Sequence, residues 1–202
     1  MRKIRAVPDS TPPILTIGHS NHTEEVFLDL LSRHRIDVLA DVRSHPYSRY
    51  NPHFNRESLQ QAVKAAGVRY LFLGDQLGGR PEDEASYDQT GHVLYWRVAE
   101  SPEFLAGIER LERGRVQYRV ALMCSEEDPA VCHRYLLVSR VLTERGGSVE
   151  HVRGDGTVQK QQDVDRSSGV GQGMLFADLE RDSWKSLLSV LPKAPPSDSL
   201  VE

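Results

Sequence analysis

The sequence contains few cysteines and no long apolar run, and each absence excludes a class of protein. Its 202 residues include only two cysteines, Cys124 and Cys132, which are too few for the disulfide framework of a small secreted domain. We therefore expect thiols or ligands at these positions rather than a disulfide. The longest apolar runs, such as residues 68–73, are far shorter than the ~20 residues that cross a bilayer, so we expect no membrane segment.

We also expect no secretory leader, and the sequence has no excess of basic residues. Residues 1–8 carry positive charge but are not followed by the apolar segment of a signal peptide, so we expect a cytoplasmic protein. The net charge of −4 argues against nonspecific coating of nucleic acid, which depends on clustered lysine and arginine. One stretch, residues 42–56, is nevertheless basic and aromatic and contains no acidic residue.

Strand-like and helix-like segments alternate between residues 13 and 154. Short apolar β-type runs are found at residues 14–17, 38–42, 68–73, 118–123 and 148–152. The intervening segments have apolar residues at helical spacing, with helix caps expected at Asn21 or Thr23, Asn55, Ser101 and Asp128. This alternation predicts a single α/β domain over residues 13–154, with a mostly parallel sheet and flanking helices.

Two segments fall outside that alternation. Residues 74–92 have turn composition and no apolar period, which predicts a long surface loop or lid. Residues 155–202 are polar at first, which predicts a flexible linker and a C-terminal segment. Beyond Asp178 that segment has apolar residues that a helix packed on the domain would also explain.

Polar, reactive residues follow three of the expected strands. These strand ends are residues 18–21, 41–46 and 124–129. Ligands of open parallel sheets bind beyond the carboxyl ends of the strands, so the three segments are expected to share one site. Taken singly, His19 could be a buried structural histidine, Asp41 an acceptor for loop amides and Asp128 a helix cap. Their convergence is typical of an acid–base site.

For such a site, Asp41 and Glu126 are the candidates for general base or nucleophile, and His19 for proton transfer. Arginines suit a phosphate or carboxylate, and tyrosines can stack on a base or sugar. A solvated or salt-bridged surface is the alternative interpretation of these arginines. The candidate substrate-binding residues are Ser20, Asn21, Arg43, Ser44, Tyr47, Arg49, Tyr50 and Arg134.

The cysteines allow three interpretations. Cys124, Cys132 and His133 have side chains that bind zinc or iron, although seven residues between the cysteines and an adjacent histidine match no common zinc motif. Cys124 alone could be a catalytic thiolate, since it leaves a strand toward a helix N-terminus. Glu126 would oppose that role by raising the thiol pKa. Burial without reactivity is the third interpretation.

The three strand-end motifs together resemble the domain of unknown function 488 family. They are Gly18-His19-Ser20-Asn21, Asp41-Val42-Arg43-Ser44-x-Pro46-x-Ser48-Arg49-x-x-Pro52-x-Phe54 and Cys124-x-Glu126-x-Asp128-Pro129-x-x-Cys132-His133-Arg134. The resemblance implies an α/β fold and no settled activity. Residues 38–43 also resemble the Asp-Val-Arg strand of rhodanese-like sulfurtransferases, although the acidic loop after Cys124 would not cradle an anion as a rhodanese loop does.

A short motif in the tail indicates a partner. Gln172, Leu175 and Phe176 resemble the Gln-x-x-Leu-Phe peptide by which bacterial DNA polymerases and repair proteins bind the sliding clamp. Such a peptide inserts its apolar side chains into a pocket while a linker supplies reach. The alternative is a C-terminal helix that uses the same apolar residues for packing.

Three functional hypotheses follow. The first is an enzyme of the hydrolase or transferase type that acts on a phosphate-bearing, nucleotide or nucleic-acid substrate and is linked to DNA repair. The second is a non-catalytic module that binds nucleic acid or the sliding clamp. The third is a cysteine-based redox or sulfur-transfer protein. The sequence identifies no cofactor.

Overall fold

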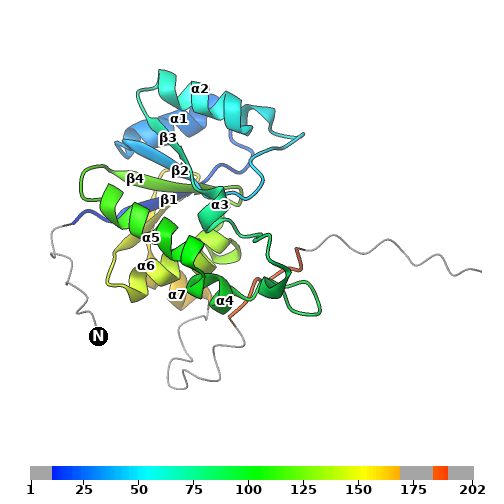
Figure 1. Ribbon diagram of the computed structural model, residues 1–202. Coiled ribbons are helices and arrows are strands. Elements are labelled where there is room, and N and C mark those ends of the chain that lie inside the picture. Colours follow the sequence, from blue (N-terminus) through cyan, green and yellow to red (C-terminus); the bar gives the residue numbers. More distant parts are fainter. Residues whose placement is uncertain (1–10, 169–183, 191–202) are drawn as a thin grey trace, which may run out of the picture.

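The structure is a computed structural model, and it describes residues 11–168 and 184–190 (Figure 1). Its strands are β1 (Ile14–Gly18), β2 (Val38–Asp41), β3 (Arg69–Phe72), β4 (Val120–Cys124), β5 (Val149–Val152) and β6 (Val158–Lys160). They form one sheet in the order β3-β2-β4-β1-β5-β6. Every neighbouring pair is parallel except β5 and β6, which confirms the predicted mostly parallel α/β fold.

Helices cover both faces of the sheet. The helices are α1 (Glu24–Arg33), α2 (Arg56–Ala65), α3 (Gly74–Leu77), α4 (Tyr95–Glu100), α5 (Pro102–Gly114), α6 (Arg140–Glu144) and α7 (Gln161–Ser168). Figure 1 shows α1 and α2 on one face and α5, α6 and α7 on the other. Within the described residues, no helix is long and apolar enough to span a membrane.

The two-residue period of the strands divides the core into two layers. Leu15 and Leu39 pack with Phe27 of α1 and the buried residues of α2, whereas Ile14 and Ala40 belong to the layer that contains α5. Because both faces are covered, the strands β1, β2 and β4 are buried along their whole length. Their carboxyl ends are therefore held in a rigid frame.

Three of the four expected helix caps are confirmed. The Thr23 side chain accepts a hydrogen bond from the amide of Val26 at the start of α1. The Ser101 side chain accepts one from the amide of Phe104 at the start of α5, and the Asp128 side chain accepts one from the amide of Ala130. The fourth, Asn55, stands at the N-cap position of α2 as expected, but its side chain makes no capping bond there. Its Oδ1 accepts instead from the amide of Ser48, at 2.7 Å, and so braces the loop after β2.

The segment expected to be one helix after Asp128 is divided. A 3₁₀ turn (Pro129–Val131) is followed by a π-helical stretch (Arg134–Ser139) and then by α6. The Ser139 hydroxyl donates to the carbonyl of Arg134 at 2.6 Å within that stretch. Wide helical turns of this kind are frequent at functional sites. They place Cys132 and His133 in the junction between two helical segments.

Two other segments differ from the sequence-based expectation. Residues 74–92 contain α3 and a short 3₁₀ turn (Glu84–Ser86). The helix α3 packs on α5 through Leu77, which is buried. Beyond residue 154, where a flexible linker was expected, β6 and α7 continue the domain. Residues 184–190 form no helix. They run beside residues 91–94, with the Ser186 amide donating to the carbonyl of Val93. Gln172, Leu175 and Phe176 lie outside the described residues.

A buried histidine joins α7 to the sheet. His151 of β5 has one ring nitrogen, Nδ1, 2.8 Å from the Thr16 hydroxyl and the other, Nε2, 2.9 Å from the Gln161 amide oxygen. Arg134 donates to the same Thr16 oxygen. The hydroxyl can then donate to Nδ1 while Nε2–H donates to Gln161, an arrangement that needs a neutral ring.

We expect His151 to make the protein less stable in mild acid. Burial, together with the charges of Arg134 and Arg153, lowers the pKa of this histidine to about 4. The unfolded chain, with a pKa of about 6.5, binds the proton first, so stability falls as the pH drops from 6.5 toward 4. Between pH 7 and pH 5 the loss from this residue should be about 2 kcal/mol.

Urea unfolding at the two pH values measures that loss. The pKa of His19 is similarly lowered, so His19 also contributes to the pH dependence of the unfolding free energy. Variants are needed to separate the contributions of the two histidines. His151→Asn should reduce the pH dependence of the unfolding free energy, whereas His45→Asn, at an exposed position, should leave it as in the wild type. An unchanged slope in His151→Asn would contradict the assignment.

Candidate active site

The carboxyl ends of β2, β4 and β1 lie side by side at one edge of the sheet. Gly18 pairs with Cys124 and Asp41 pairs with Met123 in the parallel register. The three polar segments expected from the sequence therefore leave the sheet together. The motifs alone do not predict that these three segments are neighbours. In the sheet, β4 lies between β1 and β2, which are consecutive in the chain.

The first of these ends is packed directly on the loop after β4. The amide of His19 donates to the carbonyl of Cys124 at 2.9 Å, and that of Ser20 to the carbonyl of Ser125 at 2.8 Å. A side chain at Gly18 would place its Cβ 1.8 Å from the carbonyl oxygen of Glu126. Only glycine permits this approach, which explains its place in the first motif.

A buried ion pair fixes the second strand end. Arg43 donates to both carboxylate oxygens of Asp41, at 2.9 and 2.7 Å, and to the carbonyl of Phe54. The Asp41 carboxylate also accepts from the Tyr70 hydroxyl at 2.6 Å. Burial lowers the pKa of Arg43, but the hydrogen bonds with Asp41 outweigh it and the net shift is upward. Asp41 is thus fully engaged in holding Arg43.

His19 completes this cluster as a neutral ring. Its Nε2 lies 3.2 Å from Nη1 of Arg43, and its Nδ1 lies 2.8 Å from the carbonyl of Ser20. Since the guanidinium can only donate, Nε2 accepts and Nδ1 carries the proton. Burial, and then the charge of Arg43, lowers the pKa of His19 to about 4. The predicted role of His19 in proton transfer stays a prediction.

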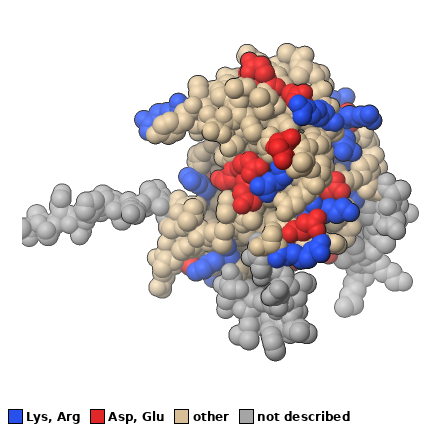
Figure 2. Space-filling view, turned by 180° about the vertical axis from the view of Figure 1, so that it is seen from behind, with Lys and Arg blue, Asp and Glu red and all other residues tan. Residues whose placement is uncertain are grey.

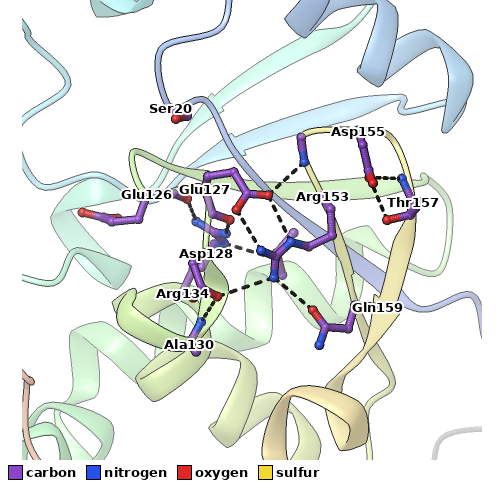
Figure 3. Close-up of polar contacts among 12 residues, drawn as sticks. Ser20, Glu126, Glu127, Asp128, Ala130, Arg134, Arg153, Asp155, Thr157 and Gln159 are labelled. Carbon is purple, nitrogen blue, oxygen red and sulfur yellow. Dashed lines mark hydrogen bonds and ion pairs between the residues drawn. The ribbon is translucent and has the colours of Figure 1, made fainter. Parts of the chain in front are cut away.

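Arg134 is placed differently from the expectation that it binds substrate. It has no exposed surface, and its guanidinium donates to the backbone carbonyls of Glu126 and Glu127 and to the Thr16 hydroxyl. All three of its guanidinium nitrogens are occupied by the protein. Figure 3 shows it turned toward this backbone. Arg134 therefore fixes the backbone of the loop after β4 from its buried side.

The two glutamates of that loop point in different directions (Figure 3). Glu127 binds Arg153 at 2.8 Å and accepts from the amide of Gly154, so it anchors the loop to the end of β5. Glu126 is turned away from that ion pair and lines a cavity. The carboxylate of Glu126 is therefore the one available for chemistry.

The cavity, of about 390 Å³, lies over the ends of β2 and β4. Its wall includes residues 186–190, which run beside residues 91–94. The other lining residues are Arg43, Ser44, His45, Tyr47, Gly79, Arg80, Tyr95, Cys124, Ser125, Glu126, Val131, Cys132 and His133. Sequence reasoning missed Arg80, Tyr95 and residues 186–190, because they come from segments without a motif.

The two cysteines meet at the inner wall of this cavity. Cys124 Sγ donates to a carboxylate oxygen of Glu126 at 3.1 Å and lies 3.6 Å from Nδ1 of His133. Cys132 Sγ lies 3.9 Å from the same nitrogen. Burial raises the pKa of Cys132. Burial also raises that of Glu126, but the hydrogen bonds from Cys132 and Cys124 outweigh it, so its pKa is lowered overall.

The candidate site residues fall into three groups. Arg43, Ser44, Tyr47, Cys124 and Glu126 line the cavity. His19, Asp41 and Arg134 are buried supports, none of which lines it. The third group, Ser20, Asn21, Arg49 and Tyr50, lies outside it. Tyr50 is 89% exposed, so a direct role would require a ligand that extends beyond the cavity.

Comparison with known families agrees with the second and third motifs, whereas the first, at residues 18–21, precedes the matched range. Residues 23–141, more than half of the chain, match the family described as "Domain of unknown function DUF488". The matched range contains the segments after β2 and β4 that line the cavity. No curated protein and no solved structure matches the chain.

Proposed function

Because this chain belongs to the DUF488 family, whose description assigns no reaction, we propose its function from the site: a cytoplasmic enzyme acting on a phosphate-bearing substrate, either a nucleotide or a nucleic acid. The observation that carries the proposal is the charge of the cavity wall. The wall contains the guanidinium groups of Arg43 and Arg80 and the ring of His45 beside a single carboxylate, that of Glu126, although Asp41 neutralises Arg43. Such a wall favours an anionic ligand.

The size and the aromatic residues of the cavity support the same ligand class. Its volume of about 390 Å³ lies in the range typical of small-molecule sites, about 300 to 1,000 Å³. Tyr47 is 60% exposed at the rim, where its ring is free to stack on a base, and its hydroxyl donates to Glu57. A mononucleotide, or one nucleotide of a longer chain, fits these dimensions.

One face of the molecule argues for local recognition rather than broad binding. In the face shown in Figure 2, acidic and basic side chains are interspersed. Elsewhere in the described residues, charged side chains also form ion pairs, such as Arg145 with Glu112 and Arg140 with Glu144. Nonspecific nucleic-acid binding needs clustered cations. Affinity for a phosphate would therefore come from the cavity.

The chemistry is assigned to Glu126. Its carboxylate lines the cavity, whereas that of Asp41 is buried beneath Arg43 and Tyr70. Glu126 would act as the general acid–base group on a substrate held by Arg80 and by the second N–H group of Arg43 Nη1, the one donor of that guanidinium without a partner among the described residues. Asp41 would act only by positioning Arg43. A role in DNA repair, with the sliding clamp bound through residues 172–176, remains a proposal based on sequence.

Thermal unfolding with 5′-mononucleotides tests the ligand class. Nucleotides should raise the unfolding midpoint, because they bind the folded state only, whereas the matching nucleosides should not. Arg80→Gln should weaken binding about tenfold or more, because a charged hydrogen bond to phosphate is lost. Arg49→Gln is the matched control, since Arg49 is exposed but does not line the cavity.

Equal midpoint shifts from nucleosides and nucleotides, or equal losses of affinity in the two arginine variants, would refute the ligand class.

Catalysis is tested by incubating the protein with nucleotides or oligonucleotides and looking for products by mass spectrometry. Glu126→Gln should retain binding and lose turnover. Binding by the wild type without any product would identify a non-catalytic module instead.

A second candidate function, thiol-based sulfur transfer or redox chemistry, is favoured by the 3.6 Å approach of Cys124 Sγ to Nδ1 of His133. A histidine beside a cysteine can take the proton of the thiol and so generate the nucleophilic thiolate. The Glu126 carboxylate, hydrogen-bonded to the same sulfur, opposes the thiolate by like charge. A midpoint shift with thiosulfate but not with nucleotides would support this second candidate.

A further inference from the structure

Three side chains that bind transition metals converge at the inner wall of the cavity. The sulfurs of Cys124 and Cys132 and a ring nitrogen of His133 all lie within 4.8 Å of one another. Nδ1 of His133 is 3.6 Å from one sulfur and 3.9 Å from the other. In a tetrahedral zinc site, with bonds of about 2.3 Å to sulfur and 2.0 Å to nitrogen, the ligand atoms are separated by roughly 3.5 to 3.8 Å. The cluster therefore needs to contract by only about 1 Å to enclose a zinc ion.

The histidine is held in the tautomer that a metal requires. Its Nε2 lies 2.9 Å from the carbonyl oxygen of Val42, which can only accept a hydrogen bond. The ring proton is thus on Nε2, and the lone pair of Nδ1 faces the two sulfurs. Metal-binding histidines usually donate their second nitrogen in this way, to a backbone carbonyl or a carboxylate.

The surroundings of the sulfurs suit thiolates bound to a cation. The backbone amide of Arg134 donates to Cys132 Sγ at 3.4 Å, a contact that helps to stabilise a thiolate. The buried guanidinium of Arg134 is bound to carbonyls and a hydroxyl, so its charge is not neutralised by a carboxylate among its hydrogen-bond partners. Two thiolates with one zinc ion are neutral together, which lowers the cost of burying them.

The backbone explains how an uncommon spacing can form such a site. Cys124 is the last residue of β4, whereas Cys132 and His133 lie in the junction between the 3₁₀ turn and the π-helical stretch. Cys132 has extended backbone angles (φ −112°, ψ 142°) and His133 has helical ones (φ −59°, ψ −24°). This change of conformation lets two successive side chains reach the same point.

We propose that Cys124, Cys132 and His133 bind one zinc ion as three protein ligands. The three side chains line the cavity, so the fourth coordination position faces its interior, beside Glu126. Three protein ligands and one open position are typical of catalytic rather than structural zinc sites. The inference concerns metal binding alone and is independent of the substrate proposed above.

Cobalt(II) substitution tests the site directly in the full-length protein. Reduced protein, stripped with a chelator, is titrated with Co²⁺ and its absorption recorded. One equivalent should produce the visible bands of tetrahedral cobalt and near-ultraviolet bands of thiolate-to-cobalt charge transfer, and Zn²⁺ should abolish both. The charge-transfer bands can arise only from Cys124 and Cys132, because the chain has no other cysteine.

Variants assign the ligands. Cys132→Ser and His133→Asn should each weaken Co²⁺ binding by more than about 100-fold. His45→Asn is the matched control, since His45 lines the same cavity outside the cluster and its loss should leave the titration unchanged. A wild-type titration without thiolate-to-cobalt bands would overturn the proposal, whatever the folding of the variants. Equal affinities in wild type and Cys132→Ser would also overturn it.

Discussion

Replacing Gly18 with alanine should destabilise the protein by about 3 kcal/mol or more. The added Cβ would lie 1.8 Å from the carbonyl oxygen of Glu126 and 2.8 Å from Cα of Glu127. These are backbone atoms, so no side-chain rotation relieves the overlap. The carbonyls are in addition held by Arg134 from the other side, which prevents the loop from withdrawing without losing those hydrogen bonds.

Equilibrium unfolding in urea, compared with the wild type, measures this effect. Gly114→Ala is a suitable control. Gly114 ends α5, and a Cβ there would meet only a methyl group of Val120, at 3.9 Å. That substitution should be neutral or slightly stabilising, because alanine is the better helix former. Equal stability of the two variants would mean that the end of β1 does not pack on the loop after β4 as described.

Asp41→Asn is the second substitution with a large expected effect, a loss of about 3 to 5 kcal/mol. The carboxylate is completely buried and accepts hydrogen bonds from Arg43 and Tyr70. An amide of the same shape removes the negative charge and leaves the guanidinium of Arg43, itself only 5% exposed, buried without its counterion. Breaking one side of a buried ion pair costs far more than losing a surface pair.

Asp29→Asn is the matched control for this change. Asp29 forms an exposed ion pair with Arg33 on α1, and its loss should change the unfolding free energy by no more than about 1 kcal/mol. If Asp41→Asn were as stable as the wild type but inactive, Asp41 would be a catalytic residue, as the sequence alone suggests. Because Asp41 holds Arg43 in the structure, we expect the opposite, that a loss of stability accompanies any loss of function.

The location of the site could be predicted from the sequence because it depends only on periodicity and topology. Short apolar runs indicate the strands at residues 14–17, 38–42 and 118–123, and parallel strands present their carboxyl ends at one edge. No knowledge of side-chain contacts is needed for that step. It accounts for the successful grouping of Arg43, Cys124 and Glu126.

Which residues line the cavity and which only support it could not be predicted from the sequence, because this depends on three-dimensional contacts. A motif shows an arginine at position 134 but does not show that backbone carbonyls from residues 126 and 127 turn inward to meet it. The same holds for Asp41, whose partners are Arg43, in the loop after β2, and Tyr70 of β3. Tyr95 and residues 186–190 line the cavity from segments with no chemical motif.

The most direct test of the account is to map where a nucleotide binds. Amide resonances of ¹⁵N-labelled protein, titrated with adenosine 5′-monophosphate, should shift at residues 43–45, 47, 79–80, 124–126 and 186–190, which line the cavity over β2 and β4. They should remain unchanged around a second cavity, at the amino end of β5, lined by residues 147–150 and 160–162. Shifts confined to that second cavity, or scattered over the surface, would contradict the assignment of the site.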